Sequence, residues 1–545
     1  MSLNHFSKAV LTIIVAILVS CGTITTPKSF RTAKSAATST WQTQPPAHLR
    51  TNTATVGEPP PTPGQPAAST GNMKLFLPTI ASTPTANGPG TKEYFVAPNG
   101  SPNGNGSIMN PWDFQTALEE PDVLNPGDII WLRGGKYGNG GATLFNSKLV
   151  GTEGHPYTVR AYPGEHVVID GALMVYREWT IFWGLEVMNS DPKRKTDISG
   201  SVPGDITRTD GFNIFATHTK FINNVVHDAG EGFGLSTAAI DAELYGNIAY
   251  NNGWSGPDRG HGYGVYAQNE EGTKFFRENI IFNNFGEYGI HVYGEQVQLK
   301  GFLFEGNINF NGQYLVGGLQ PAGRVSLIDN HFFRNNALFG YRNQNNEDLT
   351  LKGNIFGTAS TPSLDVRWWQ NIDISGNRIW SESRTAAAIE YPSGQRNYQW
   401  DRNTYYVPGQ NAFMVNASER SWEQWKQESG FDQNSSLTVG LPSGVEVFIR
   451  PNIYEAKRAN IVIYNWDLID TIAVDLSGAG LEIGDRYFLH NVQNYFEETI
   501  QGVYDGSPIN IPMTGWTIAT PIGWESPLQP STFPLFGVFV LTIKE

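Results

Sequence analysis

The chain has 545 residues, a formal net charge of −14, 59 Gly, 15 Trp and a single Cys. Its length predicts more than one domain. The acidic balance argues against nucleic acid as a partner, because such binding depends on Lys and Arg neutralising phosphates. One Cys excludes an intrachain disulfide, so each domain must be stable through its own core.

Residues 1–21 are predicted to be a targeting segment. Lys8 gives the positive start, and residues 9–19 are apolar but too short to span a membrane as a mature helix. The run ends in Leu18-Val19-Ser20-Cys21, which resembles a bacterial lipoprotein signal. The resemblance implies a lipid on Cys21 and an extracytoplasmic, membrane-anchored protein. The alternative is an ordinary secretory signal with an incidental Cys.

Residues 22–92 are rich in Thr, Pro, Ser and Ala. This composition cannot bury a core and predicts a disordered tether. Residues 94–97 and 126–135 are predicted strands, and residues 113–119 a short helix. This region is expected to close one end of the structure that follows, since an open stack of strands exposes its interior and edge.

From about residue 208 to 406 one short pattern recurs: a Gly or polar residue, an Asn, and usually a β-branched residue. The repeated Asn residues are 23 to 32 residues apart, at Asn224, Asn247, Asn279, Asn307, Asn330, Asn354, Asn377 and Asn403. A period in the low twenties is typical of a solenoid. The short apolar runs between turns predict strands, three in each coil. Each Asn is expected to stack on the next and satisfy buried polar groups of an internal turn.

This pattern resembles the right-handed parallel β-helix of pectate-lyase-like proteins, over residues 93–435. After a predicted closing helix within 421–435, the strand pattern becomes antiparallel. We therefore predict an all-β chain, a right-handed parallel β-helix solenoid with a C-terminal antiparallel β-sandwich domain at residues 445–545. The sandwich would cap the β-helix or bind carbohydrate, and the chain is expected to be a monomer.

In pectate-lyase-like proteins the substrate groove follows one sheet, so the outward positions of that sheet are candidate site residues. Aligning the coils gives one outward column of Asn213, Ser236, Tyr266, His291, Gln320, Arg342, Asp365 and Glu390. A second column includes Gln268, Tyr293 and Arg367. The longest coil inserts residues 254–262 before Tyr266, and insertions in repeats tend to mark a binding face. The coil before it contributes His227, Asp228 and Glu231.

The predicted site therefore centres on Arg259, His261, Tyr266, His291 and Tyr293. The residues predicted to bind substrate are Trp254, Gln268, Gln320, Arg342, Asp365 and Arg367. Residues 259–269 and 288–291 also resemble a block found in secreted bacterial β-helix proteins of undefined activity.

The favoured chemistry is β-elimination on a uronic-acid polysaccharide. His261 or His291 would take the proton beside the substrate carboxylate, and Tyr266 or Tyr293 would protonate the leaving oxygen. Arg259 or Arg342 would hold the carboxylate. Calcium often fills this holding role in related lyases. No cofactor is required by the sequence, but Glu231, Asp258 and Glu287 could supply oxygen ligands.

Two alternatives remain open. Residues 209–212 and 260–262 resemble two short motifs of polygalacturonases, which are glycoside hydrolases. The paired Asp motif expected between them is replaced by Glu231-Gly232, and the later Arg-x-Lys motif is absent. Asp365 and Glu390 are other candidate carboxylates for hydrolysis. The last alternative is a binding or structural solenoid without catalysis, in which the aromatic strip stacks on sugars.

Overall fold

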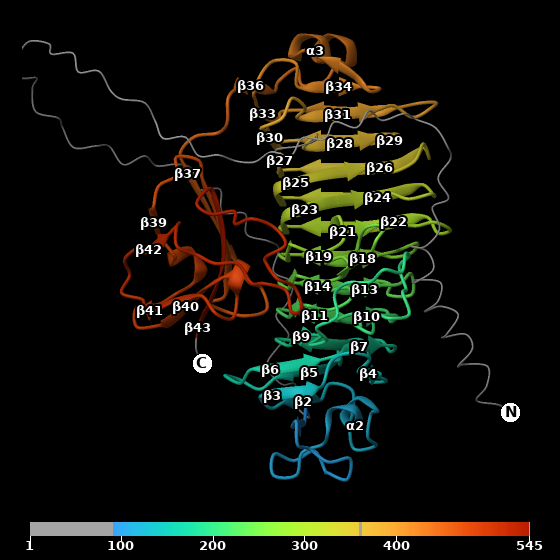
Figure 1. Ribbon diagram of the computed structural model, residues 1–545, viewed down its shortest axis with the longest axis vertical. Helices are drawn as coiled ribbons and strands as arrows, with labels where there is room; N and C mark the ends of the chain where they lie inside the picture. Colours follow the sequence, from blue (N-terminus) through green and yellow to red (C-terminus); the bar gives the residue numbers. More distant parts are fainter. Residues whose placement is uncertain (1–90, 359–361, 544–545) are drawn as a thin grey trace, which may run out of the picture. The chain divides into compact units, whose positions relative to one another are not determined.

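The computed structural model describes residues 91–358 and 362–543. The predicted signal segment, its Cys21 and nearly all of the predicted tether lie outside this range. Residues 93–439 form a parallel β-helix whose stacked coils build three ladders of parallel strands (Figure 1). The predicted fold class is confirmed. No helix in the described residues is long and apolar enough to cross a membrane.

The first ladder of parallel strands has one strand from each coil. Its 12 strands are, in order, β1 (Glu93–Val96), β2 (Ile129–Leu132), β5 (Tyr157–Ala161), β8 (Thr180–Trp183), β11 (Lys220–Ile222), β14 (Glu243–Tyr245), β19 (Lys274–Arg277), β22 (Leu299–Glu305), β24 (Ala322–Ile328), β26 (Asn346–Lys352), β29 (Trp369–Ser375) and β32 (Asn397–Asp401).

Two further ladders complete the coils. The second ladder contains β4 (Leu144–Ser147), β7 (Ala172–Val175), β10 (Phe212–Ile214), β13 (Phe233–Leu235), β18 (Val265–Ala267), β21 (Tyr288–Val292), β28 (Leu364–Arg367), β31 (Ala387–Glu390) and β34 (Phe413–Val415). The third contains β3 (Gly135–Gly138), β6 (Val167–Asp170), β9 (Glu186–Met188), β12 (Val225–His227), β15 (Ile248–Tyr250), β20 (Ile280–Phe282), β27 (Ile355–Thr358), β30 (Arg378–Ser381), β33 (Thr404–Val407) and β36 (Ser436–Val439). The long strands β23 (Ile308–Val316) and β25 (His331–Phe339) pair in both ladders.

The repeated Asn residues form a continuous ladder inside the β-helix. Asn307 shows the pattern: its Oδ1 accepts from the backbone and side-chain nitrogens of Asn279, at 3.1 and 2.9 Å, and its Nδ2 donates to Phe276 O and Asn330 Oδ1. The residue before each Asn has a positive φ, for example Gly306 at 66° and Asp329 at 53°. Gly, Asn and Asp tolerate this conformation, which explains the first position in most copies of the pattern, whereas Glu278 and Arg402 adopt it in the other two.

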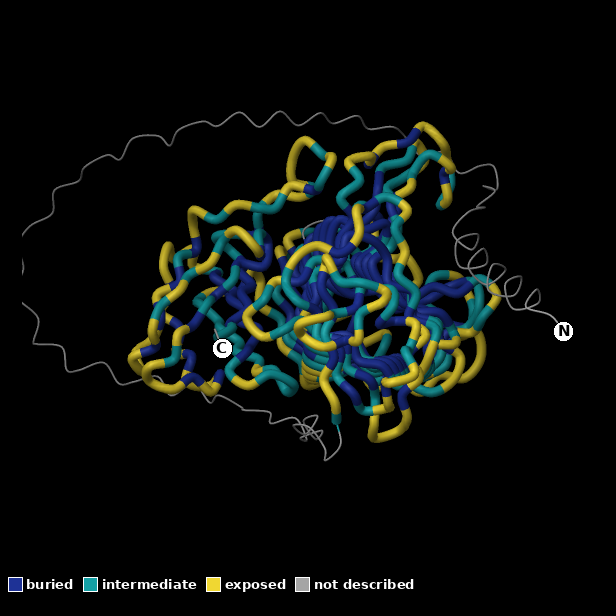
Figure 2. The backbone as a smooth tube through the Cα atoms, turned by 90° about the horizontal axis from the view of Figure 1, so that it is seen from below, coloured by how far each residue is buried: buried dark blue, intermediate teal, exposed yellow. Residues whose placement is uncertain are grey.

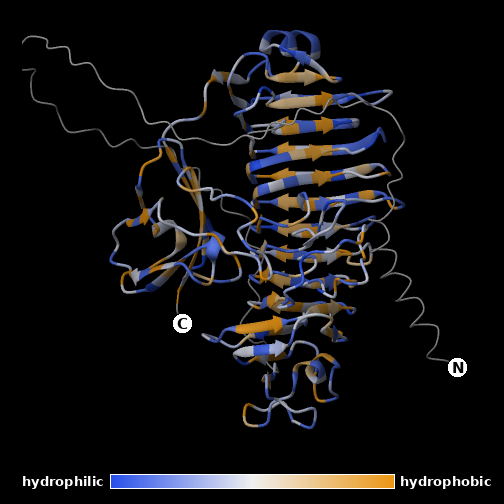
Figure 3. Cartoon of the chain, in the orientation of Figure 1, coloured by the Kyte–Doolittle hydropathy of each residue, from blue (hydrophilic) through white to orange (hydrophobic). Residues whose placement is uncertain are grey.

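The inner surface of the coils is apolar and carries stacked aromatic rings. Phe212 lies 5.3 Å from Phe233 between ring centroids, and Phe276 lies 4.7 Å from Phe304. Figure 2 shows the buried residues gathered within the stacked coils and the exposed residues in the loops. Apolar and polar residues alternate along many of the strands in Figure 3, as a sheet with one buried face requires.

Short helices close the two ends as predicted. At the N-terminal end α2 (Phe114–Leu118) is capped by Asp113, whose carboxylate accepts from Thr116 N at 3.0 Å. At the other end α3 (Trp422–Ser429) begins with a capping box between Ser421 and Gln424, and the hairpin of β34 with β35 (Ser418–Arg420) lies beside it. Trp425 of α3 is completely buried, so the helix seals the apolar interior of the last coil.

The C-terminal domain consists of antiparallel strands, as predicted. Its larger sheet runs β37 (Val445–Pro451), β38 (Ala459–Asn465), β43 (Phe536–Ile543), β40 (Arg486–Asn491) and β41 (Thr499–Val503). The smaller sheet pairs β39 (Thr471–Val474) with β42 (Ile509–Pro512), and two 3-10 turns are η1 (Ser477–Ala479) and η2 (Val492–Asn494). One apolar core is shared by strands of both sheets.

The C-terminal domain packs directly on the third ladder. Tyr250, Phe282 and Phe310 form an outward aromatic stack with centroid distances of 5.1 and 4.5 Å. These rings share a buried cluster with Tyr464 and Phe536 of the domain. An apolar outer face of this kind requires a cover, and the domain supplies it.

A bidentate ion pair also joins the C-terminal domain to the β-helix. Arg450 of β37 donates to both carboxylate oxygens of Glu278, at 2.8 and 2.7 Å. We expect Arg450→Met to lower the free energy of unfolding by about 2 kcal/mol, because Glu278 then keeps a largely buried charge without its partner. The double variant Arg450→Met/Glu278→Met should recover most of the loss in a urea titration. Equal loss in both variants would mean that lost packing, and not the unpaired charge, sets the effect.

Candidate active site

A recess opens on the second ladder beside β10, β13 and β18. It has a volume of about 50 Å³. An antiparallel hairpin of β16 (Trp254–Ser255) and β17 (Gly260–His261) flanks it. The lining residues are Ser201, Asp210, Gly230, Glu231, Trp254, Arg259, His261, Gly262, Tyr263 and Tyr266. Three of the five predicted catalytic residues, Arg259, His261 and Tyr266, therefore meet at one place.

The strand register corrects part of the predicted outward column. The observed column runs through Asn213, Gly234, Tyr266, His291, Leu315, Leu338, Asp365 and Ala388. The prediction was right at Asn213, Tyr266, His291 and Asp365. It was wrong at Ser236, Gln320, Arg342 and Glu390, because loops of unequal length separate the strands and shift the alignment by two to five residues.

Two carboxylates occupy equivalent positions in neighbouring coils at the recess. Asp210 precedes β10 and Glu231 precedes β13, each two residues before the strand. Backbone bonds fix the two segments together, Gly211 N to Glu231 O and Gly230 N to Thr209 O, both 2.7 Å. A β-carbon at Gly230 would lie 2.9 Å from Asp210 Oδ1, so only Gly fits beside that carboxylate.

Both carboxylates are held toward the protonated form. Burial raises the pKa of Asp210 to about 6, opposed by a 3.2 Å hydrogen bond from Asn213 Nδ2. Burial, reinforced by the Asp210 charge, raises the pKa of Glu231 well above its usual range. Two nearby carboxyl groups with raised pKa values are typical of acid–base sites. The sequence contains the same acidic-Gly-Phe tripeptide at both places, Asp210–Phe212 and Glu231–Phe233. The sequence alone does not give the strand register that brings the two carboxylates side by side.

These pKa shifts predict a pH-dependent cost in stability. A carboxyl whose folded pKa exceeds its unfolded pKa contributes its stabilisation below the unfolded pKa and loses it as pH rises through the folded pKa. A shift of Asp210 from 3.8 to about 6 is equivalent to at most about 3 kcal/mol, and partial exposure lowers this. We expect Asp210→Asn to raise the free energy of unfolding by about 1–2 kcal/mol at pH 8 and by much less at pH 4. Equal effects at both pH values would contradict the shift.

The hairpin presents a histidine with a fixed ring. His261 stacks on Trp254 at 5.3 Å with an interplanar angle of 6°, and its Nε2 lies 3.1 Å from Asp258 Oδ1. Asp258 also accepts from Arg259 at 2.9 Å, and Arg259 donates to Ser201 Oγ at 3.0 Å. Burial lowers the pKa of His261 although the Asp258 hydrogen bond opposes it. The imidazole is therefore neutral at pH 7, and with Nε2 donating to Asp258 its Nδ1 carries the lone pair.

The other two predicted catalytic residues, His291 and Tyr293, pack behind Tyr266. The His291 ring is surrounded by tyrosines, with centroids 4.5 Å from Tyr263 and 4.8 Å from Tyr288, and burial lowers its pKa to about 3. Only 7% of His291 is exposed. Tyr266 donates to Tyr293 O at 3.2 Å, and Gln268 Nε2 donates to the same carbonyl at 3.1 Å. This arrangement supports the position of Tyr266 in the recess wall.

The remaining predicted binding residues lie farther along the β-helix. Arg367 pairs with Asp365 at 2.9 Å, four strands beyond β18 in the second ladder. Gln320 donates to Glu295 O, and Arg342 is exposed and lies over the Tyr341 ring. Only an extended substrate could reach both this region and the recess. Trp254, in contrast, lines the recess itself.

The predicted calcium ligands do not come together. Asp258 contacts Arg259 and His261, Glu231 lies beside Asp210, and Glu287 is exposed. Among the described residues there is no group of three His, Cys, Asp or Glu side chains that could hold a metal ion. The predicted trio therefore does not fit calcium.

His227 and Asp228 do not line the recess. Their side chains are hydrogen-bonded to each other, and Asp228 accepts a hydrogen bond from Ile522 N of the C-terminal domain at 2.8 Å.

Comparisons with known proteins agree with this fold. Residues 94–323 match a family model described as a Pel9A-like right-handed β-helix region, and residues 258–405 match a second right-handed β-helix model. The chain is 23% identical over 372 residues to pectate lyase L of Dickeya dadantii (strain 3937), covering 59% of this chain and 83% of that protein.

Solved structures give more distant matches. The crystal structure of pectate lyase Pel9A is 15% identical and covers 60% of this chain and 76% of its own, with a TM-score of 0.35. A mannuronic acid specific polysaccharide family 6 lyase from human gut microbiota is 15% identical. The match covers 65% of this chain and 92% of that protein, with a TM-score of 0.36. The strand pairings and the two family models together identify residues 94–405 as a right-handed parallel β-helix.

Proposed function

We propose that this chain is an extracytoplasmic polysaccharide lyase that cleaves a uronic-acid polymer by β-elimination in the recess of Asp210, Glu231, Arg259, His261 and Tyr266. The observation that carries the proposal is the neutral His261, whose Nε2 is held by Asp258 while a carboxyl group with a raised pKa lies in the same recess. The sequence similarity to pectate lyase L supports the substrate class.

His261 is assigned as the base. Its Nδ1 would take the proton from the sugar carbon next to the carboxylate. The electron pair of that C–H bond would form a double bond to the neighbouring ring carbon, and the glycosidic C–O bond would break. Asp258 fixes the tautomer and orients the ring, as a carboxylate does in other histidine bases. Nothing in this step requires a protonated imidazole, which agrees with the lowered pKa.

Elimination requires a group that neutralises the negative charge of the substrate carboxylate. Arg259, with one nitrogen 2.9 Å from Asp258, supplies a cation at the recess edge. A protonated Glu231 would donate a hydrogen bond to the same carboxylate, because its raised pKa keeps it neutral at pH values where free glutamate is ionised. Both contacts make the neighbouring proton more acidic. Tyr266 is assigned to protonate the leaving oxygen, which requires its hydroxyl to turn from Tyr293 O, 3.2 Å away, toward the substrate.

Glycoside hydrolysis is the second candidate, favoured by the Asp210–Glu231 pair. Two carboxyl groups with raised pKa values in one recess could provide an acid and a base or nucleophile. Under this mechanism His261 would only position the substrate. The two mechanisms therefore assign opposite importance to His261 and Asp210.

The test is a screen of the protein against uronate and neutral polysaccharides, with calcium and with a chelator. Elimination creates a conjugated double bond that absorbs near the ultraviolet edge, whereas hydrolysis creates only reducing ends. A rise in absorbance on a uronate polymer would support the proposal. Reducing ends without absorbance would favour hydrolysis, and neither signal on any polymer would overturn both. Loss of activity with the chelator would reveal a calcium requirement that the predicted trio cannot supply.

The lipid anchor on Cys21 is also proposed, from the Leu18–Cys21 motif. Full-length protein expressed in a bacterial host should partition into the detergent phase, and Cys21→Ala should move it to the aqueous phase. Equal partitioning of the two forms would contradict lipidation.

A further inference from the structure

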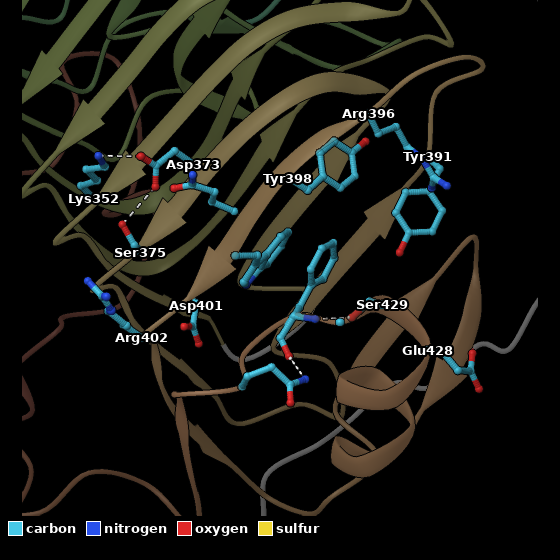
Figure 4. Close-up of a pocket in the computed structure, with 15 residues that line it drawn as sticks. Lys352, Asp373, Ser375, Tyr391, Arg396, Tyr398, Asp401, Arg402, Glu428 and Ser429 are labelled. Carbon is cyan, nitrogen blue, oxygen red and sulfur yellow. Dashed lines mark hydrogen bonds and ion pairs between the residues drawn. The ribbon is translucent and has the colours of Figure 1, made fainter.

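A second and larger cavity lies at the C-terminal end of the β-helix, away from the recess. It has a volume of about 620 Å³ and is built on the first-ladder strands β26, β29 and β32 and on α3. We name it the C-terminal cavity and define it by Lys352, Asp373, Tyr391, Arg396, Tyr398 and Arg402. Figure 4 shows Tyr391, Arg396 and Tyr398 on one side of it and Lys352, Ser375 and Arg402 on the other.

The aromatic side of the cavity is preorganised. The Tyr391 and Tyr398 rings stack with centroids 6.0 Å apart, and Tyr398 donates to Trp369 O at 2.5 Å. Arg396 lies 4.2 Å above the Tyr391 ring. Both tyrosines are partly exposed and Arg396 is exposed. Tyrosine rings with fixed positions give sugar rings a contact surface at low entropic cost.

Within the part of the chain that the structure describes, the carboxylates at the cavity have polar partners, whereas two of the arginines form no ion pair. Its carboxylates have partners: Asp373 pairs with Lys352 at 2.6 Å, Glu428 with Arg420 at 2.5 Å, and Asp401 accepts from Asn434 Nδ2 at 2.7 Å. Among the described residues, neither Arg396 nor Arg402 forms an ion pair with a carboxylate. Two guanidinium groups are thus left to meet an anion, and a guanidinium binds a carboxylate through two parallel hydrogen bonds.

We propose that the C-terminal cavity is a second saccharide site that binds an acidic oligosaccharide, with Arg396 and Arg402 on the carboxylates and Tyr391 and Tyr398 on the sugar rings. The assignment of the ligand as a uronate rests on the proposed function. The arginines and tyrosines of the cavity by themselves indicate an acidic saccharide. The recess belongs to the second ladder and this cavity to the first, so the cavity is separate from the reacting centre. A second site of this kind would keep a long polymer near the enzyme between cleavage events.

The test measures binding of oligogalacturonate, oligomannuronate and neutral xylo-oligosaccharide by titration calorimetry, in a His261→Gln background that slows turnover. We expect an acidic oligosaccharide to bind and Arg396→Gln to weaken that binding about tenfold or more, as loss of a charge-assisted pair requires. Tyr391→Ala should also weaken it. Arg384→Gln, at an exposed arginine outside the cavity, is the matched control and should bind like the parent.

The outcomes separate this proposal from the proposed function. Unchanged binding in both Arg396→Gln and Tyr391→Ala, with melting temperatures equal to the parent, would overturn the second site whether or not the enzyme is a lyase. Equal binding of the neutral oligosaccharide would overturn the acidic class. Binding that depends on Arg396 in a protein without lyase activity would support the cavity and reject only the mechanism.

Discussion

His261→Gln is expected to lower the turnover of the uronate substrate by about 10²–10⁴-fold, the range for loss of a general base. Glutamine can still donate to Asp258 and pack on Trp254, as His261 does at 3.1 and 5.3 Å. It has no lone pair of comparable basicity. The expected result is therefore a fall in kcat with little change in KM and in the melting temperature.

The matched control for this prediction is His155→Gln. His155 is exposed in a loop before β5, and its loss should leave kcat unchanged. The activity of the wild-type protein should also rise with pH through the pKa of His261, which burial places below 6.5, and fall again as Glu231 loses its proton. If His261→Gln kept full activity while Asp210→Asn abolished it, hydrolysis by the carboxylate pair would be the better account.

Asn307→Ala is expected to lower the free energy of unfolding by about 3–5 kcal/mol, among the largest effects of a single substitution. The substitution removes four hydrogen bonds at once and leaves the backbone nitrogen of Asn279 and the carbonyl of Phe276 buried without partners. Because Asn307 stands in the middle of the ladder, both neighbouring coils lose their link.

Denaturant unfolding followed by circular dichroism measures this effect. Asn343→Ala, at an exposed bend, is the control and should change the unfolding free energy by less than about 0.5 kcal/mol. A similar small effect for Asn307→Ala would mean that the ladder contributes little and that the apolar interior alone holds the coils in register.

The fold was predictable because the period and the Asn positions are local features. A left-handed backbone residue and an Asn recur at each turn, usually followed by a β-branched residue, as at Gly306–Ile308, and the Asn of each copy satisfies the same buried polar groups. The sequence did not predict that the C-terminal domain packs on the aromatic stack of Tyr250, Phe282 and Phe310. When both faces of a strand are buried, the sequence pattern does not distinguish apolar residues that point outward from those that point inward.

The candidate site was predictable only in part. The hairpin of Trp254 and His261 stood out as an insertion beside Tyr266, and the structure places all three at the recess. The pairing of Asp210 with Glu231 depends on the register of neighbouring coils, which loops of variable length conceal. Burial of His291 among tyrosines depends on packing between the neighbouring coils of β18 and β21, which no short motif encodes.

The most direct test of the central claim is the mass of the products formed from a defined uronate oligosaccharide. Elimination predicts that the masses of the two products sum to the mass of the substrate. The double bond then lies in the sugar at the new nonreducing end, which belongs to the fragment from the reducing side of the cleaved bond. Hydrolysis adds one water to that sum. Products that carry the additional water would contradict β-elimination in this recess.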